Sequence, residues 1–271
     1  MRGRPVRALL LLTLVPLLVV LGLLAVAALH GRGAERPRAP AVSTPGFAAA
    51  GTVRTDVGRG ATGAAIFRRP GNAAGAVVVL LHGWGRTDPR IYAPWISHLV
   101  ARGATVVFPA YQAAPYLDTV SPLANTLAAM TVALRKVSVA HGRLVVAGYS
   151  AGGALAADVA ASARAAGLPA PAAVYSIYPG RSLPGIPLRI PRVSARNIPA
   201  GTRLVVLAGE RDRVVGTRVA RQIARTASRA RVTLRTVRDD MVDDHGAPER
   251  HDAVARRTFW SPLDRLIKAA P

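Results

Sequence analysis

The sequence predicts an α/β fold, a mostly parallel, doubly wound sheet covered by helices on both faces. From about residue 61 onward, short apolar and β-prone runs alternate with longer stretches of helical periodicity. One of these runs, Ala76–Leu81, is apolar throughout, as is typical of a strand buried on both faces. In such a sheet the crossovers are right-handed, and a site is expected at the carboxyl ends of the strands.

The elements follow in order along the chain. The predicted strands are Ala64–Phe67, Ala76–Leu81, Thr105–Phe108, Leu144–Ala147, Ala172–Ile177, Leu204–Ala208 and Val232–Val237. Between them, a first helix carries Ile91, Trp95, Leu99 and Val100 and ends at Gly103. A second follows an N-cap at Ser121 with Pro122 in its first turn, and shows an apolar stripe at Leu123, Leu127, Met130, Leu134 and Val137. Two more are predicted near Val215–Ala227 and Pro248–Ala269, the last broken at Ser261-Pro262.

The N-terminal segment has a different composition. Three arginines precede an apolar stretch over residues 8–29, which is long enough to cross a bilayer as a helix. We predict a signal-anchor or transmembrane segment in residues 1–30, a flexible Pro/Arg/Ala-rich linker in 31–60 and a globular domain in 61–271. The domain would then be anchored to the membrane outside the cytoplasm. Ala25-Val26-Ala27 leaves cleavage by signal peptidase open, which would make the protein secreted.

Charge and cysteine content exclude some classes of function. The 271 residues contain no cysteine, so neither disulfides nor thiolate metal sites are available. The net charge of +22 is carried almost entirely by arginines spread through the chain. Because no nucleic-acid motif accompanies them and aromatic residues are few, we expect no nucleic-acid partner. Solvated surface charge explains the arginines best, with attraction to an anionic membrane or polymer as the alternative.

The residues Gly148-Tyr149-Ser150-Ala151-Gly152 lie between a predicted strand and an Ala-rich helix. A serine on such a tight turn exposes its hydroxyl at the carboxyl end of the sheet, and the flanking glycines let the backbone pass closely. Ser150 is therefore a candidate nucleophile. The alternative is a Gly-rich turn with a capping serine.

An oxyanion site is predicted beside it. After the strand Ala76–Leu81 comes His82-Gly83-Trp84-Gly85. Acyl-transfer chemistry needs two preorganised N–H donors, and the backbone amides of Ala151 and Trp84 are the candidates. His82 is expected to hold the loop rather than to act as a base. The alternative for this segment is an ordinary Gly-rich turn.

An acid and a base follow at later strand ends. Asp212 comes shortly after the strand Leu204–Ala208, with Glu210 as its nearest competitor and helix capping as its alternative role. His245 lies in the loop before the final helix, and His251 is the alternative base. The aspartates around His245 lack metal-loop spacing, so we predict a solvated acidic loop and no metal.

In the order Ser150, Asp212, His245, these motifs resemble those of the α/β-hydrolase family, specifically its serine esterases and lipases. The resemblance covers roughly residues 60 to 271. It implies that Gly148–Gly152 is the nucleophile elbow and that no cofactor is needed. The segment Gly180–Gly201, where relatives often carry a lid, is too short for a cap domain, which argues against interfacial lipase behaviour.

The sequence thus predicts a serine hydrolase that cleaves small or lipid-like carboxylic esters through an acyl-enzyme. Alternatives are an envelope acyltransferase or peptidase with the same triad, and a non-catalytic binding module on this fold. Aromatic residues near strand ends are candidates to line a substrate pocket, with ordinary helix or sheet packing as the alternative for each one; they are Trp84, Tyr92, Tyr111, Tyr116, Tyr149 and Tyr178. The domain is expected to be monomeric.

Overall fold

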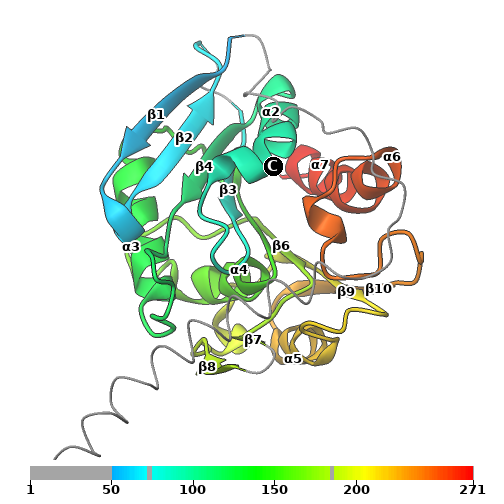
Figure 1. Cartoon of the computed structure of the whole chain (residues 1–271). Coiled ribbons are helices and arrows are strands. Elements are labelled where there is room, and N and C mark those ends of the chain that lie inside the picture. The colour runs from blue at the N-terminus through cyan, green and yellow to red at the C-terminus, as the bar shows by residue number, and fades with distance from the viewer. Residues whose placement is uncertain (1–50, 72–74, 184–185, 271) are drawn as a thin grey trace, which may run out of the picture. The chain divides into compact units, whose positions relative to one another are not determined.

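The computed structural model describes residues 51–71, 75–183 and 186–270. An eight-stranded sheet forms its centre, in the order β1-β2-β4-β3-β5-β6-β9-β10 (Figure 1). The predicted signal-anchor and the linker up to residue 50 lie outside the described residues, so both remain predictions. Within the described ranges, no helix is long and apolar enough to cross a bilayer.

The strands confirm the predicted alternation. Their bounds are β1 Val53–Val57, β2 Ala64–Arg68, β3 Val77–Leu81, β4 Thr105–Pro109, β5 Leu144–Tyr149, β6 Ala173–Ile177, β9 Arg203–Gly209 and β10 Arg231–Val237. From β4 to β10 all neighbours pair in parallel, while β2 runs antiparallel to both β4 and β1. β3, β4, β5 and β6 are buried along their whole length, as the continuous apolar runs predict.

Helices cover both faces of this sheet. The α-helices are α2 Ala93–Ala101, α3 Pro122–Leu134, α4 Ala151–Ser162, α5 Arg218–Thr226, α6 Ala253–Ala255 and α7 Ser261–Lys268. One buried cluster joins α3, α4 and α5 to side chains such as Val79, Val146 and Val206. The other joins α2 and α7 to side chains such as Val78, Val145 and Leu207 from the opposite face. These adjacent residues alternate between the clusters because successive strand residues point to opposite faces.

The first strand corrects the predicted domain boundary. Residues 53–57, assigned to the flexible linker, form β1 and pair in register with β2, from Val53 opposite Arg68 to Val57 opposite Ala64. Four of the five residues of β1 are exposed, and the alternation of Val53, Thr55 and Val57 with two charged residues is too short to separate a strand from the linker in the sequence. Its pairing with the edge of the sheet supplies the missing stabilisation, and the folded domain begins before residue 61.

Two helices refine the prediction. In the predicted stripe of α3, Met130 and Val137 are buried, and the three leucines are partly buried and pack against the same core cluster. Smaller buried side chains, Pro122, Thr126, Ala129 and Ala133, complete the face toward the core. Ser121 occupies the N-cap position, but its hydroxyl makes no capping hydrogen bond. The last helix is continuous at Ser261-Pro262, because the π-helical turn Arg256–Trp260 precedes α7 and the proline falls in the first turn of α7.

The segment predicted to hold a small lid contains a short hairpin, β7 Ser182–Leu183 and β8 Ile186–Arg189, followed by the 3₁₀ turn Ala195–Asn197 (Figure 1). No cap domain is inserted between β6 and β9 in the described residues, as the length of the segment predicts.

Candidate active site

Ser150 lies at the sharp turn between β5 and α4. Its backbone has φ 57° and ψ −120°, a conformation that is strained for a residue with a side chain. The Ser150 amide donates to the Ile177 carbonyl at 3.0 Å, and the Ser150 carbonyl accepts from the Gly180 amide at 3.0 Å. These bonds to β6 and to the segment that follows it hold the strained turn in place.

Glycines on both sides make the turn possible. A Cβ on Gly152 would lie 2.3 Å from the Leu81 carbonyl oxygen, and a Cβ on Gly148 would lie 2.1 Å from the Gly152 carbonyl oxygen. The helix therefore starts in direct backbone contact with the end of β3, and the Gly152 amide donates to the His82 carbonyl at 3.0 Å. The predicted close approach is confirmed by these distances.

The structure brings Ser150, His245 and Asp212 together from three strand ends. Ser150 Oγ lies 3.0 Å from His245 Nε2, and His245 Nδ1 lies 2.8 Å from Asp212 Oδ2. Asp212 Oδ1 accepts from the amides of Val214 and Val215, which fixes the carboxylate and leaves its other oxygen for the imidazole. Ser150 and Asp212 are 7% and 5% exposed. The alternative acid and the alternative base take no part in these contacts. Glu210 pairs with Arg238, and His251 is exposed.

The loop that carries His245 is held by tyrosine hydroxyls. Tyr149 donates to the His245 carbonyl at 2.7 Å, and Tyr178 donates to the Val242 carbonyl at 2.7 Å. Asp243 is buried and forms an ion pair with Arg211 at 2.9 Å. Asp239, Asp240 and Asp244 are exposed, as the predicted solvated loop implies, whereas Asp243 is buried. The described residues contain no cluster of side chains suited to hold a metal ion.

His82 supports the neighbouring loop, in agreement with its predicted structural role. The side chain is fully buried, stacks on Tyr111 at 4.0 Å between ring centroids, and has ring nitrogens 2.6 Å from the Gly83 carbonyl and 2.7 Å from the Ala110 carbonyl. Burial lowers the pKa of His82 to about 4 against the opposing effect of these carbonyls. At neutral pH the imidazole is therefore uncharged and donates only one of the two contacts.

Further contacts fix the backbone on both sides of Trp84. The Gly83 amide donates to the Tyr92 hydroxyl at 3.0 Å, and the Gly85 amide donates to Gln112 Oε1 at 2.9 Å. The Trp84 amide between them has no acceptor in the part of the chain that the structure describes. An amide left free between two anchored neighbours can donate to a bound oxygen atom.

Glu249 joins this loop to the histidine loop. Its carboxylate accepts from Arg86 Nε at 2.9 Å and Arg86 Nη2 at 2.6 Å, and from the Tyr92 hydroxyl at 3.2 Å. The hydrogen bonds to Glu249 raise the pKa of the Arg86 guanidinium. Because Tyr92 holds Gly83 and Arg86 follows Gly85, one carboxylate braces the backbone before and after Trp84. Sequence reasoning missed Glu249, and only its short spacing from His245 could have signalled it.

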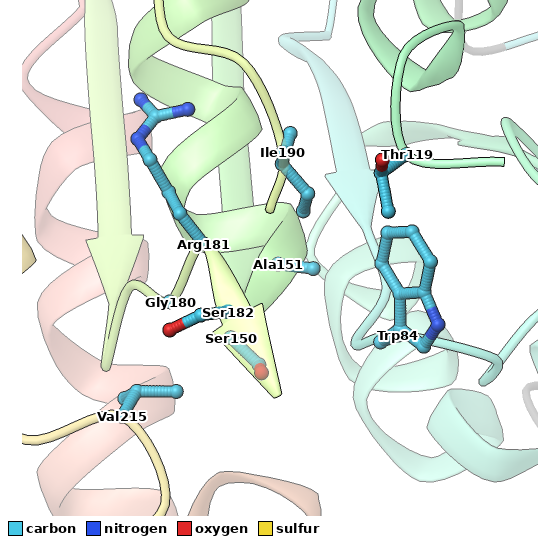
Figure 2. A pocket seen from close by; sticks show the side chains of 9 residues that line it. All are labelled: Trp84, Thr119, Ser150, Ala151, Gly180, Arg181, Ser182, Ile190 and Val215. Atoms are coloured by element: carbon cyan, nitrogen blue, oxygen red, sulfur yellow. The ribbon is translucent and has the colours of Figure 1, made fainter. Parts of the chain in front are cut away.

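A small pocket opens beside Ser150 (Figure 2). Its cavity volume is about 20 Å³, and its lining is Trp84, Thr119, Ser150, Ala151, Gly180, Arg181, Ser182, Ile190 and Val215. The two predicted oxyanion residues thus share this pocket with Ser150. The other lining residues come from separate loops that carry no sequence motif, so the sequence did not identify them.

Of the aromatic residues predicted for the substrate site, Trp84 lines this pocket, whereas the prediction is wrong for Tyr92, Tyr111, Tyr149 and Tyr178. These four tyrosines are buried, and each hydroxyl bonds to the backbone of a loop. Tyr111 donates to the His82 carbonyl at 2.6 Å, and the other three bind as described above. A buried tyrosine hydroxyl needs a partner, and loop carbonyls and amides at the strand ends provide it.

The Arg181 side chain is held by a buried carboxylate. Its guanidinium makes two 2.7 Å contacts with the carboxylate of Asp158, which is 1% exposed on α4. In Figure 2 the Arg181 side chain points away from Ser150. This ion pair ties the start of the β7–β8 segment to α4, and Asp158 also accepts from the Val193 amide at 3.1 Å.

Parallel strands, covering helices and a serine on a strand–helix elbow define the general class of this protein as a hydrolase-type α/β fold. The chain belongs to the alpha/beta hydrolase fold family, whose sequence model matches residues 78–236. No curated protein sequence matches the chain significantly.

Solved structures share this fold. Carboxyl esterase 2 from the mycorrhizal fungus Tuber melanosporum is 19% identical, with a TM-score of 0.66 over 90% of this chain and 97% of that one. A fungal esterase from Rhizomucor miehei is 17% identical, with a TM-score of 0.62 over 86% of this chain and 92% of that one. A thermostable esterase from Pseudomonas putida is 19% identical, with a TM-score of 0.63 over 85% of each chain. At these identities the likeness establishes the fold alone.

The burial of neutral His82 predicts a pH-dependent stability. Because the pKa of His82 falls from 6.5 to about 4 on folding, the unfolded chain binds the proton first as the pH drops. The stabilisation of the folded state by the uncharged His82 is fully present above pH 6.5 and is lost as the pH falls toward 4. Between pH 7 and pH 5, this group should lower the free energy of unfolding by about 2 kcal/mol, measured by urea denaturation.

The variant His82→Gln should show a correspondingly shallower dependence on pH over the same range, whatever its stability at pH 7. The exposed His251→Gln is the matched control and should keep the slope of the wild type. Equal slopes in the wild type and in His82→Gln would contradict the assignment.

Proposed function

We propose that this protein is a serine hydrolase that cleaves carboxylic esters, with Ser150 as nucleophile, His245 as general base and Asp212 as the acid that orients it. The observation that carries the proposal is the continuous line of contacts from Ser150 Oγ through the His245 ring to Asp212, at 3.0 and 2.8 Å. The esterases among the similar structures support the substrate class.

In the first half of the reaction, His245 Nε2 takes the hydroxyl proton as Ser150 Oγ attacks the ester carbonyl carbon. The tetrahedral intermediate collapses when its bond to the alkoxy group breaks, and His245 gives the proton to the departing alcohol. Asp212 holds Nδ1–H toward itself and stabilises the imidazolium that forms in between. The acyl group is then bound to Ser150 as an ester.

In the second half, His245 removes a proton from water as the water oxygen attacks the acyl carbonyl. The new intermediate collapses by breaking the bond to Ser150 Oγ, which takes back the proton from His245. The carboxylic acid leaves, and the free enzyme is restored. None of these steps needs a cofactor.

The oxyanion formed in each half needs donors that are in place beforehand. The amides of Ala151, directly after the nucleophile, and Trp84, between its two anchored neighbours, are proposed for this role. Their loops are rigid because glycine contacts, His82, Gln112 and Tyr92 fix them. A donor of this kind typically contributes about 3 kcal/mol to lowering the barrier.

The size of the pocket supports esters with a short acyl or alcohol group. Its cavity volume of about 20 Å³ is far below the usual size of ligand pockets, and apolar side chains such as Ile190, Val215 and Trp84 line it. A Cβ on Gly180 would lie 2.2 Å from Val215 Cγ1, so the pocket wall is closely packed at this point.

We place the reaction outside the cytoplasm, on the basis of the predicted N-terminal signal-anchor.

The test of the proposal is labelling and turnover in the same preparations. Wild-type protein should react with a fluorophosphonate probe and hydrolyse p-nitrophenyl acetate, whereas Ser150→Ala should do neither. His245→Ala and Asp212→Asn should lower kcat by about 10⁴-fold. A folded wild type that neither labels nor hydrolyses any ester of a chain-length panel would overturn the proposal.

A second prediction concerns the brace at Glu249. The substitution Glu249→Gln removes the charge that holds Arg86 and weakens the contact with Tyr92, so the Trp84 amide should be less precisely placed. We expect kcat to fall by about tenfold, with little change in KM, because the donor acts mainly on the transition state.

The matched control is Glu210→Gln, which breaks an exposed ion pair with Arg238 near Asp212. It should leave both kinetic constants unchanged. A rise in KM alone for Glu249→Gln would show that Glu249 serves binding rather than positioning of the oxyanion donor.

A third prediction concerns the pocket wall. Val215→Ala should enlarge the pocket and raise kcat/KM for hexanoyl relative to acetyl esters by about tenfold, since each methylene accommodated in an apolar pocket is worth a factor of this order. Val214→Ala, at the adjacent half-buried position outside the pocket lining, is the control. The same shift in both variants would rule out Val215 as the residue that limits chain length.

A further inference from the structure

Charge is distributed very unevenly along the second half of the chain. From Val159 to Arg238 the sequence contains fifteen arginines and only two acidic residues, Glu210 and Asp212. Asp212 contacts His245, and Glu210 pairs with Arg238. The remaining arginines of this stretch must therefore find acidic partners elsewhere or have none.

Several of them gather on α5 and on the segment around the 3₁₀ turn Ala195–Asn197. Helix α5 buries Val219, Ala220 and Ile223, and its exposed side carries three arginines spaced three and four residues apart. A groove lined by Arg192, Ser194, Gln222 and Thr226, among others, joins the helix to the preceding segment. We call the exposed arginines of these two elements the basic face; they are Arg192, Arg196, Arg218, Arg221 and Arg225.

No arginine of the basic face forms an ion pair with any described residue. Elsewhere in the domain some surface arginines have acidic partners, such as Arg54 with Asp56 and Arg90 with Asp88, and others, such as Arg135, have none among the described residues. What sets the basic face apart is that its five arginines lie on two neighbouring elements within residues 189–209 and 213–238, which contain no acidic residue. The basic face is therefore a local concentration of uncompensated positive charge.

The basic face adjoins the pocket beside Ser150. Val215 lines that pocket shortly before α5 begins at Arg218. Arg181 lines both the pocket and the groove, but its charge is balanced by Asp158. An anionic surface in contact with the basic face would thus lie next to the opening of the pocket.

We propose that the basic face binds the anionic headgroups of a lipid bilayer. Guanidinium groups bind phosphate oxygens through two parallel N–H donors, and several on one helix face can contact a planar array of phosphates. A nucleic-acid partner is disfavoured because residues 189–238 contain no aromatic side chain on which bases could stack. The proposal does not depend on the hydrolase activity.

The predicted N-terminal anchor, which lies outside the described residues, would favour this contact. A linker from residue 30 to residue 52 has a root-mean-square reach of roughly 25 Å if it is flexible. The domain would then stay close to the bilayer at a high effective concentration, so that even weak individual contacts suffice to orient it.

The experiment exploits the absence of cysteine from the chain. Full-length protein carrying Gln222→Cys, labelled with a fluorophore in the groove, is reconstituted into vesicles that contain a headgroup-attached quencher. We expect severalfold stronger quenching in equal parts of phosphatidylcholine and phosphatidylglycerol than in phosphatidylcholine alone. High salt should abolish the difference, since the attraction is screened.

The variant Arg218→Gln/Arg221→Gln/Arg225→Gln should lose the difference as well. Its matched control is Arg59→Gln/Arg68→Gln/Arg69→Gln, which removes the same charge near β1 and β2 at the other edge of the sheet and should keep the difference. Equal quenching in the two kinds of vesicle would overturn the proposal. An equal loss of the quenching difference in the two triple variants would overturn it as well. Tight binding of polyphosphate or RNA without quenching by vesicles would overturn it in favour of a soluble polyanion.

Discussion

The backbone crossing between the start of α4 and the end of β3 is the contact on which the rest of the site depends. Gly152 lies so close to the carbonyls of Leu81 and His82 that any side chain would push the two elements apart. This contact keeps Ser150 in its strained conformation and brings the loop after β3 beside it. The proposed nucleophile and both proposed oxyanion donors thus owe their relative positions to one close approach that only glycine allows.

Around that crossing, the protein holds its loops with buried side chains rather than with a cap domain. His82, Tyr92, Tyr111, Tyr149 and Tyr178 each direct a polar atom to the backbone of a strand-end loop. Such hydrogen bonds cost little entropy, because the side chains are already fixed by packing. Residues that look like a binding surface in the sequence are therefore the framework of the site, and the pocket itself is lined by other side chains.

Charged residues divide into two kinds in this domain. Glu249, Asp158 and Asp212 are partly or wholly buried, and each joins loops that are distant in the sequence. The exposed arginines of the basic face have no such partner, so their electrostatic free energy depends on what approaches from outside. The three buried acidic residues, Asp158, Asp212 and Asp243, thus serve contacts between loops and helices, while one face of this chain of net charge +22 is left strongly positive.

The sequence by itself determined the alternation of strands and helices, because runs such as Val77–Leu81 are apolar at every position and buried on both faces. It also pointed to Ser150, Asp212 and His245, which each follow a recognisable strand and which the structure brings within hydrogen-bonding distance of one another. The sequence missed β1, whose exposed residues form a strand only through pairing with β2.

The tertiary structure alone decided the pocket lining and the Glu249 brace. Those contacts join residues such as Arg86 and Glu249, which lie 163 positions apart in the chain. No local pattern records a contact of this kind, because its energy arises only after the strands have brought the loops together.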